Sequence, residues 1–370
     1  MMWTTGRKAA LAGLLAVAPV AADAQKAHEG YGWRPTAVPV INFSSDDGTG
    51  FGVRVNLYEY DGASVPYRRK YSAQAFVTTG GKWVHRLLLD APQIRPNERL
   101  EAELVYEKEE FANYYGGLSD EAVAGYSRDQ RTFRQAFPEL KVKWIRALRS
   151  PWRLRLGGRL SPNSIAPHAA SGSILYALDP LGAAGCVFVQ LNGALRYDTR
   201  DNYNDASAGF LQEIMLDVGL GGGGDYRGAQ LSWVQRHFRG LVGGLVLALR
   251  TRMDLTLGDL PFYEELNLGG ISTVRGVASA RDRGEARILL NGELRWRGLP
   301  LWRRQQLYLG GVAFGDIGQI FARDSLPAGG AWRRGGGLGL RCHWHSTIVR
   351  ADYGVSGGRR AIYVTFAQLF

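Results

Sequence analysis

The residues best placed to do chemistry in this sequence are one arginine and two carboxylates. Arg275 stands in the stretch Leu268-Gly-Gly-Ile-Ser-Thr-Val-Arg-Gly276, and Asp316 stands in Phe314-Gly-Asp-Ile-Gly318. A guanidinium pairs with a carboxylate through two parallel hydrogen bonds, so these residue types predict a structural ion pair. Glu293 is a second candidate acceptor. The alternative is that Arg275 is a solvated loop residue and Asp316 an ordinary charge of the interior.

Metal chemistry has weaker support. Asp198-Thr-Arg-Asp-Asn202 clusters carboxylates that could bind calcium, but it lacks the regular spacing of a calcium loop, and these side chains more often cap turns. His343 and His345 alternate on one face, yet they have no evident third ligand and Arg341 lies beside them. We therefore expect no metal and no cofactor.

Enzymatic chemistry is the least supported class. The sequence has no Gly-x-Ser-x-Gly motif and no convincing Ser-His-Asp set. The glycine run 221–224 is followed by no helix or Lys-Ser/Thr, so it indicates a loop and not a phosphate cradle. Cys186 and Cys342 fall on opposite strand faces by parity, which argues against a disulfide. We expect that the protein is not an enzyme.

The elements that must position these residues are strands. Apolar and polar residues alternate with period two in segments of about ten residues, separated by turn-rich stretches. Between Leu100 and Glu107 apolar residues alternate with glutamates, and between Trp152 and Leu160 leucines alternate with arginines. Sixteen segments are predicted, near 33–43, 49–59, 69–79, 82–90, 100–107, 134–146, 152–162, 186–197, 210–219, 226–236, 241–255, 285–297, 306–321, 332–343, 347–354 and 361–370.

This pattern predicts an all-β fold, a single transmembrane antiparallel β-barrel of about 16 strands. A soluble sandwich would also alternate. Three features favour the membrane: segments close to the 9–11 or so residues of a tilted spanning strand, Trp and Tyr at segment ends, and connections that alternate between short and long. An even strand number places both chain ends on the same side.

The interior of this barrel is predicted to be rich in charge. Either its arginines make the lumen positive, which would favour anions, or Glu101, Glu103, Asp254 and Glu293 neutralise them across the lumen. The sequence leaves both alternatives open. The inward arginines are residues 153, 155, 159, 250, 252, 295 and 297.

The N-terminus and composition indicate export. Residues 1–24 resemble a secretory signal peptide, with the basic pair Arg7-Lys8, an apolar stretch, and the cleavage site Ala22-Asp23-Ala24. We expect cleavage near Ala24, one barrel domain over 25–370, and location in the bacterial outer membrane. The net charge of +11 then does not indicate a nucleic-acid partner. An apolar content of 45% excludes disorder, and two cysteines exclude a disulfide scaffold.

Four stretches together resemble the BamA/TamA outer-membrane superfamily, also called the bacterial surface antigen family. They are Val274-Arg275-Gly276, Phe314-Gly-Asp316-Ile-Gly318, Tyr197-Asp-Thr-Arg-Asp-Asn202, and the ending Tyr363-Val-Thr-Phe366-Ala-Gln-Leu-Phe370. Two departures stand out. Val277 takes a place that is usually aromatic, and the periplasmic POTRA modules of a typical member are missing, so the chain looks like a short, barrel-only member.

The resemblance assigns roles to these residues. It implies that the Val274-Arg275-Gly276 motif forms the tip of a long sixth extracellular loop, folded into the lumen, where Arg275 meets Asp316. Strand parity agrees, because Asp316 shares its face with Phe314 and lies opposite to Ile317, and Glu293 points inward on its own strand. The ending resembles the assembly signal of outer-membrane barrels, with Phe366 and Phe370 on one face of the last strand.

Three functions are compatible with this reading. The first is a factor that assists outer-membrane protein insertion or polypeptide translocation through a weak seam between the first and last strands, and Pro39, which cannot donate to a strand ladder, fits such a seam. The second is a passive channel for small solutes. The third is a non-channel surface antigen or scaffold. The expected partners are outer-membrane lipids including lipopolysaccharide, the barrel-assembly machinery during insertion, an unfolded outer-membrane or secreted polypeptide, and a periplasmic protein.

Overall fold

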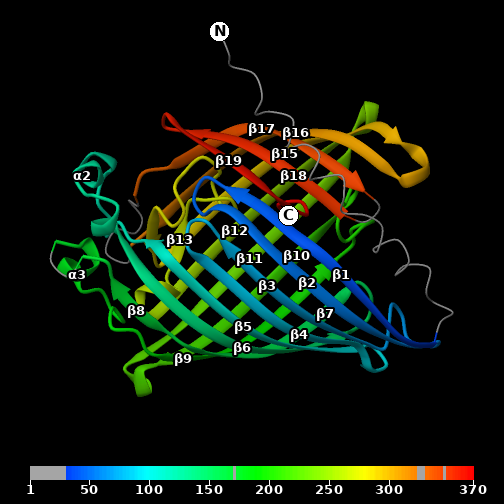
Figure 1. Ribbon diagram of the computed structural model, residues 1–370, viewed down its shortest axis with the longest axis horizontal. Coiled ribbons are helices and arrows are strands. Elements are labelled where there is room, and N and C mark those ends of the chain that lie inside the picture. Colours follow the sequence, from blue (N-terminus) through cyan, green and yellow to red (C-terminus); the bar gives the residue numbers. More distant parts are fainter. Residues whose placement is uncertain (1–30, 170–171, 323–329, 345–346) are drawn as a thin grey trace, which may run out of the picture.

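The chain forms a closed antiparallel β-barrel, shown in Figure 1. The computed structural model describes residues 31–169, 172–322, 330–344 and 347–370, and the predicted signal peptide lies outside them. The wall strands are β1 (Tyr31–Ser44), β2 (Gly48–Asp61), β3 (Arg69–Thr78), β4 (Lys82–Arg95), β5 (Glu98–Asn113), β6 (Thr132–Ala147), β7 (Trp152–Pro162), β8 (Ser164–Pro167), β9 (Val187–Asp198), β10 (Gly209–Gly221), β11 (Tyr226–Gly240), β12 (Leu245–Asp259), β15 (Ala286–Trp302), β16 (Leu307–Phe321), β17 (Arg333–Trp344), β18 (Thr347–Ser356) and β19 (Arg359–Phe366).

The prediction of 16 strands is confirmed. The sheet has 17 strand segments, but β7 and β8 are two parts of one wall strand, since both pair with β6. Each strand pairs with its neighbour in the chain, and β1 pairs with β19 to close the ring. A second, two-stranded sheet consists of β13 (Leu266–Leu268) and β14 (Asp282–Gly284).

Several predicted strand bounds were wrong for local reasons. The fifth segment extends well beyond 107, because a bulge between Glu109 and Ala112 interrupts the alternation that defined it. The eleventh begins at Leu245 and not at 241, because Gly243 and Gly244 have φ of 71° and 75° and form a turn. The last segment ends at Phe366, short of the predicted Phe370.

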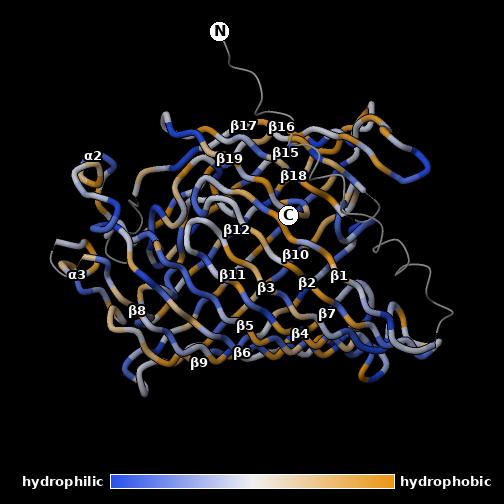
Figure 2. The backbone as a smooth tube through the Cα atoms, in the orientation of Figure 1, coloured by the Kyte–Doolittle hydropathy of each residue, from blue (hydrophilic) through white to orange (hydrophobic). Residues whose placement is uncertain are grey.

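The outer face of the wall is apolar. Large side chains are exposed there, such as Leu191 at 66%, Leu338 at 67% and Leu257 at 59%. Their strand neighbours point inward, and Figure 2 shows hydrophobic and hydrophilic residues alternating along the strands. Among the described residues, no helix is long and apolar enough to cross a membrane. An apolar outer belt of this extent is what lipid-facing strands require.

The two ends of the barrel differ. One end carries long connections over 114–131, 168–186 and 260–285, which contain α2 (Asp120–Ala124), α3 (Ile174–Leu178) and the small sheet. The other carries short turns such as 96–97 and 148–151. We call these the long-loop end and the short-turn end, and Figure 1 shows α2, α3 and β13 together at the former.

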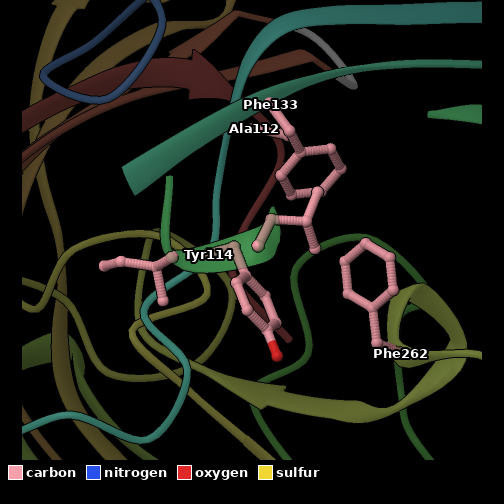
Figure 3. Packing of buried hydrophobic residues seen from close by; sticks show 6 residues of the cluster. Ala112, Tyr114, Phe133 and Phe262 are labelled. Atoms are coloured by element: carbon pink, nitrogen blue, oxygen red, sulfur yellow. The ribbon is translucent and has the colours of Figure 1, made fainter. Parts of the chain in front are cut away.

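The long loops have a hydrophobic core of their own. Residues 260–285, which we call loop six, leave the wall after β12 and return at β15. At the base of loop six the Phe262 ring is fully buried, with its centroid 5.3 Å from that of Phe133 and 5.2 Å from that of Tyr114 (Figure 3). Ile174 and Leu175 of α3 complete the cluster. Burial of these side chains fixes where loop six starts its course.

The junction between β1 and β19, which we call the seam, is short. β1 pairs with β2 along its whole length, from Tyr31↔Asp61 to Ser44↔Gly48. With β19 it pairs only at Phe43↔Val364 and Ser44↔Tyr363, near the long-loop end. Among the described strands, none pairs with the remaining edge of β1, which includes Pro39.

The chain turns inward after β19. Ala367 has φ of 65°, and its amide donates to Ile348 O. Phe370 then lies 93% buried, with Arg295 donating to its carbonyl oxygen at 3.0 Å. Phe366 remains 39% exposed on the outer face. The expectation that both phenylalanines lie on one face of the last strand was therefore wrong, because the strand ends between them, while their role as an assembly signal stays a prediction.

Candidate functional site

The guanidinium of Arg275 is fully buried in the lumen. Its Nε and Nη2 donate to Asp316 Oδ2 and Oδ1 at 2.8 and 2.9 Å, and its backbone N–H donates to Asp316 Oδ2 at 3.1 Å. Its Nη1 donates to Glu293 Oε1 at 2.7 Å and to Asp352 Oδ2 at 3.1 Å. We call these four residues the Arg275 cluster.

Strand alternation places the carboxylates. Asp316 on β16, Glu293 on β15 and Asp352 on β18 are each 3% exposed or less, and their strand neighbours Ile317, Leu294 and Tyr353 face outward. The three strands lie near one another around the barrel, separated only by β17. A loop that enters at this point meets all three carboxylates.

Two further arginines balance the charge. Arg295 Nε donates to Glu293 Oε2 at 2.8 Å, and Arg341 Nη1 donates to Asp352 Oδ1 at 2.5 Å. Three carboxylates thus face three guanidiniums. Buried charges survive only when they are paired and hydrogen-bonded, which this network satisfies for the carboxylates.

The other predicted motif residues shape the contact. Phe314 lies beneath the guanidinium, with Arg275 Cζ 3.5 Å from its ring centroid, so a cation–π contact adds to the ion pairs. Val274 is fully buried and packs with Leu268 and Leu289. Gly318 leaves room for Leu268, since a Cβ there would lie 2.8 Å from Leu268 Cδ1.

Glycines let the loop tip touch the wall. Gly276 has φ of +93°, and a Cβ on it would lie 2.8 Å from Val355 C. On β17, a Cβ at Gly335 would lie 2.0 Å from Arg275 O. A side chain at either position would push the tip away from the carboxylates.

The tip also reaches the seam. The Gly276 amide donates to Tyr363 Oη on β19 at 3.2 Å, and Arg359 Nη1 donates to Gly276 O at 3.2 Å. Arg359 Nη2 donates to Asp46 Oδ1, in the β1–β2 turn, at 2.8 Å. Loop six is therefore bonded to β19 and, through Arg359, to the turn that follows β1.

The base of loop six contains a perturbed acid. Burial, with a contribution from nearby Glu285, raises the pKa of Glu265 to about 7, and Arg283 opposes the shift. Glu265 follows Phe262 and immediately precedes β13. Its ionisation near neutral pH therefore changes the stability of this part of the loop.

The other residues considered from sequence have structural partners. Asp198 accepts from Arg200 Nε at 2.9 Å, and Asp201 accepts from the Ser207 amide at 2.9 Å. His343 Nδ1 lies 3.5 Å from Asp205 Oδ2, whereas His345 lies outside the described residues. Within the described ranges no group of three or more His, Cys, Asp or Glu could hold a metal ion.

The cysteines are both free. Cys186 Sγ lies 3.0 Å from Tyr263 Oη, in loop six, and Cys342 lies on β17.

The inward arginines follow neither predicted alternative fully. Arg252 pairs with Asp254 on the same strand at 2.9 Å, and Arg159 pairs with Glu139 on the neighbouring strand at 3.0 Å, so these charges are neutralised along the wall and not across the lumen. Arg250 instead bonds the neutral Asn291 at 2.9 Å and Ser272 O at 2.6 Å. The lumen thus has neutralised arginines together with Arg250, which has no ion-pair partner among the described residues.

Sequence reasoning missed Asp352 and Arg341. The signal was present, because Ile348, Arg350 and Asp352 alternate with Val349 and Ala351 on a predicted strand. Parity alone puts every second residue in the lumen. It cannot tell which inward carboxylate lies at the height that the loop tip reaches, because this depends on the register of β16, β17 and β18.

Comparisons with known proteins agree with this geometry. A sequence model of the Omp85 superfamily domain matches residues 108–361. The fold is similar to that of BamA from Haemophilus ducreyi lacking POTRA domains 1–3, at 13% identity and a TM-score of 0.63, over 90% of this chain and 70% of that one. No curated protein matches the sequence.

Two CdiB structures are also similar. CdiB from Escherichia coli matches at 12% identity with a TM-score of 0.60, over 90% of this chain and 63% of that one. CdiB from Acinetobacter baumannii matches at 12% identity with a TM-score of 0.55, over 91% and 65%. The chain therefore spans less than two thirds of either CdiB. Along residues 31–370, where they are described, the structure contains the barrel and its loops and no POTRA module.

Proposed function

Because this chain belongs to the Omp85 superfamily, we propose that its barrel assists the insertion or translocation of polypeptides at the outer membrane, and that the seam is the working part. The observation that carries the proposal is the contrast between the two edges of β1. One edge is paired with β2 throughout, and the other is paired with β19 at two positions.

The physical reason is the state of the β1 edge. A strand edge without a partner presents amides and carbonyls that can pair with another chain. Opening the seam breaks few backbone hydrogen bonds, so its cost is small beside that of separating any other strand pair. An incoming strand could then add to β1 while it remains held by β2.

The Arg275 cluster would hold the seam in register. Its loop tip bonds Tyr363 and Arg359 on β19, and Arg359 bonds Asp46 beside β1. Loss of the ion pairs would release the loop tip. The contact among the tip, β19 and Asp46 would then be lost. We therefore propose the cluster as a lock on the seam, with no enzymatic role.

Location and partners belong to the same proposal. Omp85 barrels are outer-membrane proteins, and long loops are extracellular in such barrels, so the long-loop end would face outward. Export would follow signal-peptide cleavage near Ala24, and the mature domain would span 25–370. Candidate partners are an unfolded outer-membrane or secreted polypeptide, the assembly machinery, lipids including lipopolysaccharide, and a periplasmic protein.

The test is a reconstitution. Purified barrel is placed in liposomes, and the folding of an unrelated urea-unfolded outer-membrane barrel is timed beside empty liposomes. We expect wild-type protein to accelerate folding. Arg275→Ala should abolish the acceleration, because the undocked tip no longer holds the seam in the register that an incoming strand needs. Equal rates with and without the protein would contradict the proposal.

A cross-link isolates the seam. In a background of Cys186→Ser and Cys342→Ser, the pair Phe43→Cys and Val364→Cys places two thiols directly opposite each other across the seam. The matched control is Ile41→Cys with Phe51→Cys, which joins β1 to β2. We expect oxidation of the seam pair to stop the acceleration and oxidation of the control pair to leave the acceleration unchanged. Full activity with the seam closed would rule out this route.

A further inference from the structure

A pocket of about 500 Å³ opens at the long-loop end. Its walls come from four parts of the chain: the ends of β5 and β6 with the connection between them, the tip of loop six, the start of β17, and the turns at the seam. This volume is that of a small-molecule site and far exceeds that of one inorganic ion.

The pocket is strongly basic. Five arginines line it against two carboxylates, Asp46 and Asp120. The guanidiniums belong to Arg128, Arg131, Arg281, Arg333 and Arg359. An excess of positive charge in a confined space attracts anions.

Three of the arginines, Arg281, Arg333 and Arg359, are held in place by carboxylates. Arg333 bonds Asp282 through Nε and Nη2 at 2.8 and 2.9 Å, and Asp120 through Nη1 at 2.7 Å. Arg281 Nε donates to Asp120 Oδ1 at 2.7 Å. Burial raises the pKa of Asp120, but the hydrogen bonds from Arg333 and Arg281 outweigh it and keep that pKa below its ordinary value. The carboxylate that orients these arginines thus stays ionised.

Some N–H donors of the pocket arginines have no acceptor. The Arg281 side chain is only 5% exposed, yet its Nη1 is buried with no hydrogen-bond partner and lies 3.6 Å from Asp282 Oδ1. Arg128 and Arg131 form no ion pair with any described residue, and Arg128 is stacked with its Cζ 3.7 Å from the Phe111 ring centroid. Arg281 Nη1 is closed off from solvent, so the donors that a ligand oxygen can reach belong to Arg128 and Arg131.

We propose that this pocket binds a phosphate-bearing ligand. A phosphoryl group offers three acceptor oxygens and up to two charges, which suits several converging guanidiniums better than a single carboxylate would. The remaining volume would hold the group that carries the phosphate. The ligand could be a soluble phosphorylated molecule or a phosphorylated glycolipid headgroup of the surrounding leaflet, and the same chemistry serves both.

The test uses the full chain in detergent with inorganic pyrophosphate as the probe, by calorimetry at about 0.15 M salt to screen surface charge. We expect Arg128→Gln and Arg131→Gln each to weaken binding by about tenfold. Both side chains lie at least partly in solvent, so neither change should disturb folding. The matched control is Arg304→Gln, an exposed arginine at the short-turn end, which should bind as wild type does.

Competition separates the two sources. Displacement of pyrophosphate by lipopolysaccharide, and not by phospholipid vesicles, would identify the glycolipid headgroup. Binding that lipopolysaccharide leaves intact would identify a soluble ligand, and both results support the site. Absence of pyrophosphate binding, or equal loss in all three variants, would overturn it.

Discussion

All three guanidinium nitrogens of Arg275 donate hydrogen bonds. Its planar fork meets both oxygens of Asp316, and the remaining nitrogen reaches Glu293 and Asp352. An ammonium group offers three donors around one point and no fork. Charge alone therefore does not account for this site, and shape contributes as well.

We expect Arg275→Lys to undock the loop tip although it keeps the charge. The variant should lose the paired bonds to Asp316, at about 2 kcal/mol, and Arg275→Ala should lose about 3–5 kcal/mol by leaving buried carboxylates unpaired. Hydrogen exchange of the Val274–Val277 amides measures this, with Arg304→Lys as the control. Wild-type protection in Arg275→Lys would show that charge is sufficient.

At this scale the sequence predicted part of the cluster. Alternation gave the inward direction of Asp316 and Glu293, and the family pattern linked Arg275 to Asp316. It did not give Asp352, because β18 reaches the cluster through pairings with β17 that set its height. Nor did it give Tyr363, whose hydroxyl meets the loop only once the ring has closed.

At the scale of elements, the strands were predictable and their ends were not. Period-two alternation holds where one face meets lipid and the other the lumen, and a bulge interrupts it, as between Glu109 and Ala112 of β5. The end of β19 depends on one residue, Ala367, whose left-handed backbone turns the chain inward. Apolar residues continue through this turn, so the sequence pattern does not show where the strand ends.

Loop six should be held less firmly as pH rises. The folded-state pKa of Glu265 is raised from 4.5 to about 7, so its contribution to stability is complete below about pH 4.5 and is lost as pH rises through about 7. We expect protection of the Leu266–Leu268 amides, corrected for intrinsic exchange, to fall over this window by on the order of 1–3 kcal/mol.

Glu265→Gln supplies the control for this pH effect. The amide keeps the size of the side chain and cannot ionise, so its protection profile should be flat between pH 5 and about pH 8. A variant profile as steep as that of wild type would assign the effect to another group.

At the scale of the whole molecule, loop six occupies the lumen. It bonds Arg250 and Asn291 on the wall through Ser272 O and Thr273 O, in addition to the Arg275 cluster. Its base is fixed among the other long loops by Phe262. The barrel wall alone would enclose a wider channel than the folded chain leaves open.

Removal of the loop tip should therefore open the barrel to ions. We expect deletion of residues 270–284 to raise single-channel conductance in planar bilayers sharply. Full-length Arg275→Ala, with the loop present and undocked, should instead show intermittent openings. Unchanged conductance after the deletion would mean that other segments close the lumen, and a wild-type barrel with steady high conductance would favour a passive channel.

The positions of the loop's partners in the chain have a consequence for biogenesis. Glu293, Asp316, Asp352 and Tyr363 all follow loop six in the sequence, on β15, β16, β18 and β19. The loop cannot reach its docked state before these strands have folded, so docking comes at the end of maturation. A barrel that is truncated or stalled before β18 would keep a solvent-exposed loop at its mouth, and proteases could distinguish it from the finished molecule.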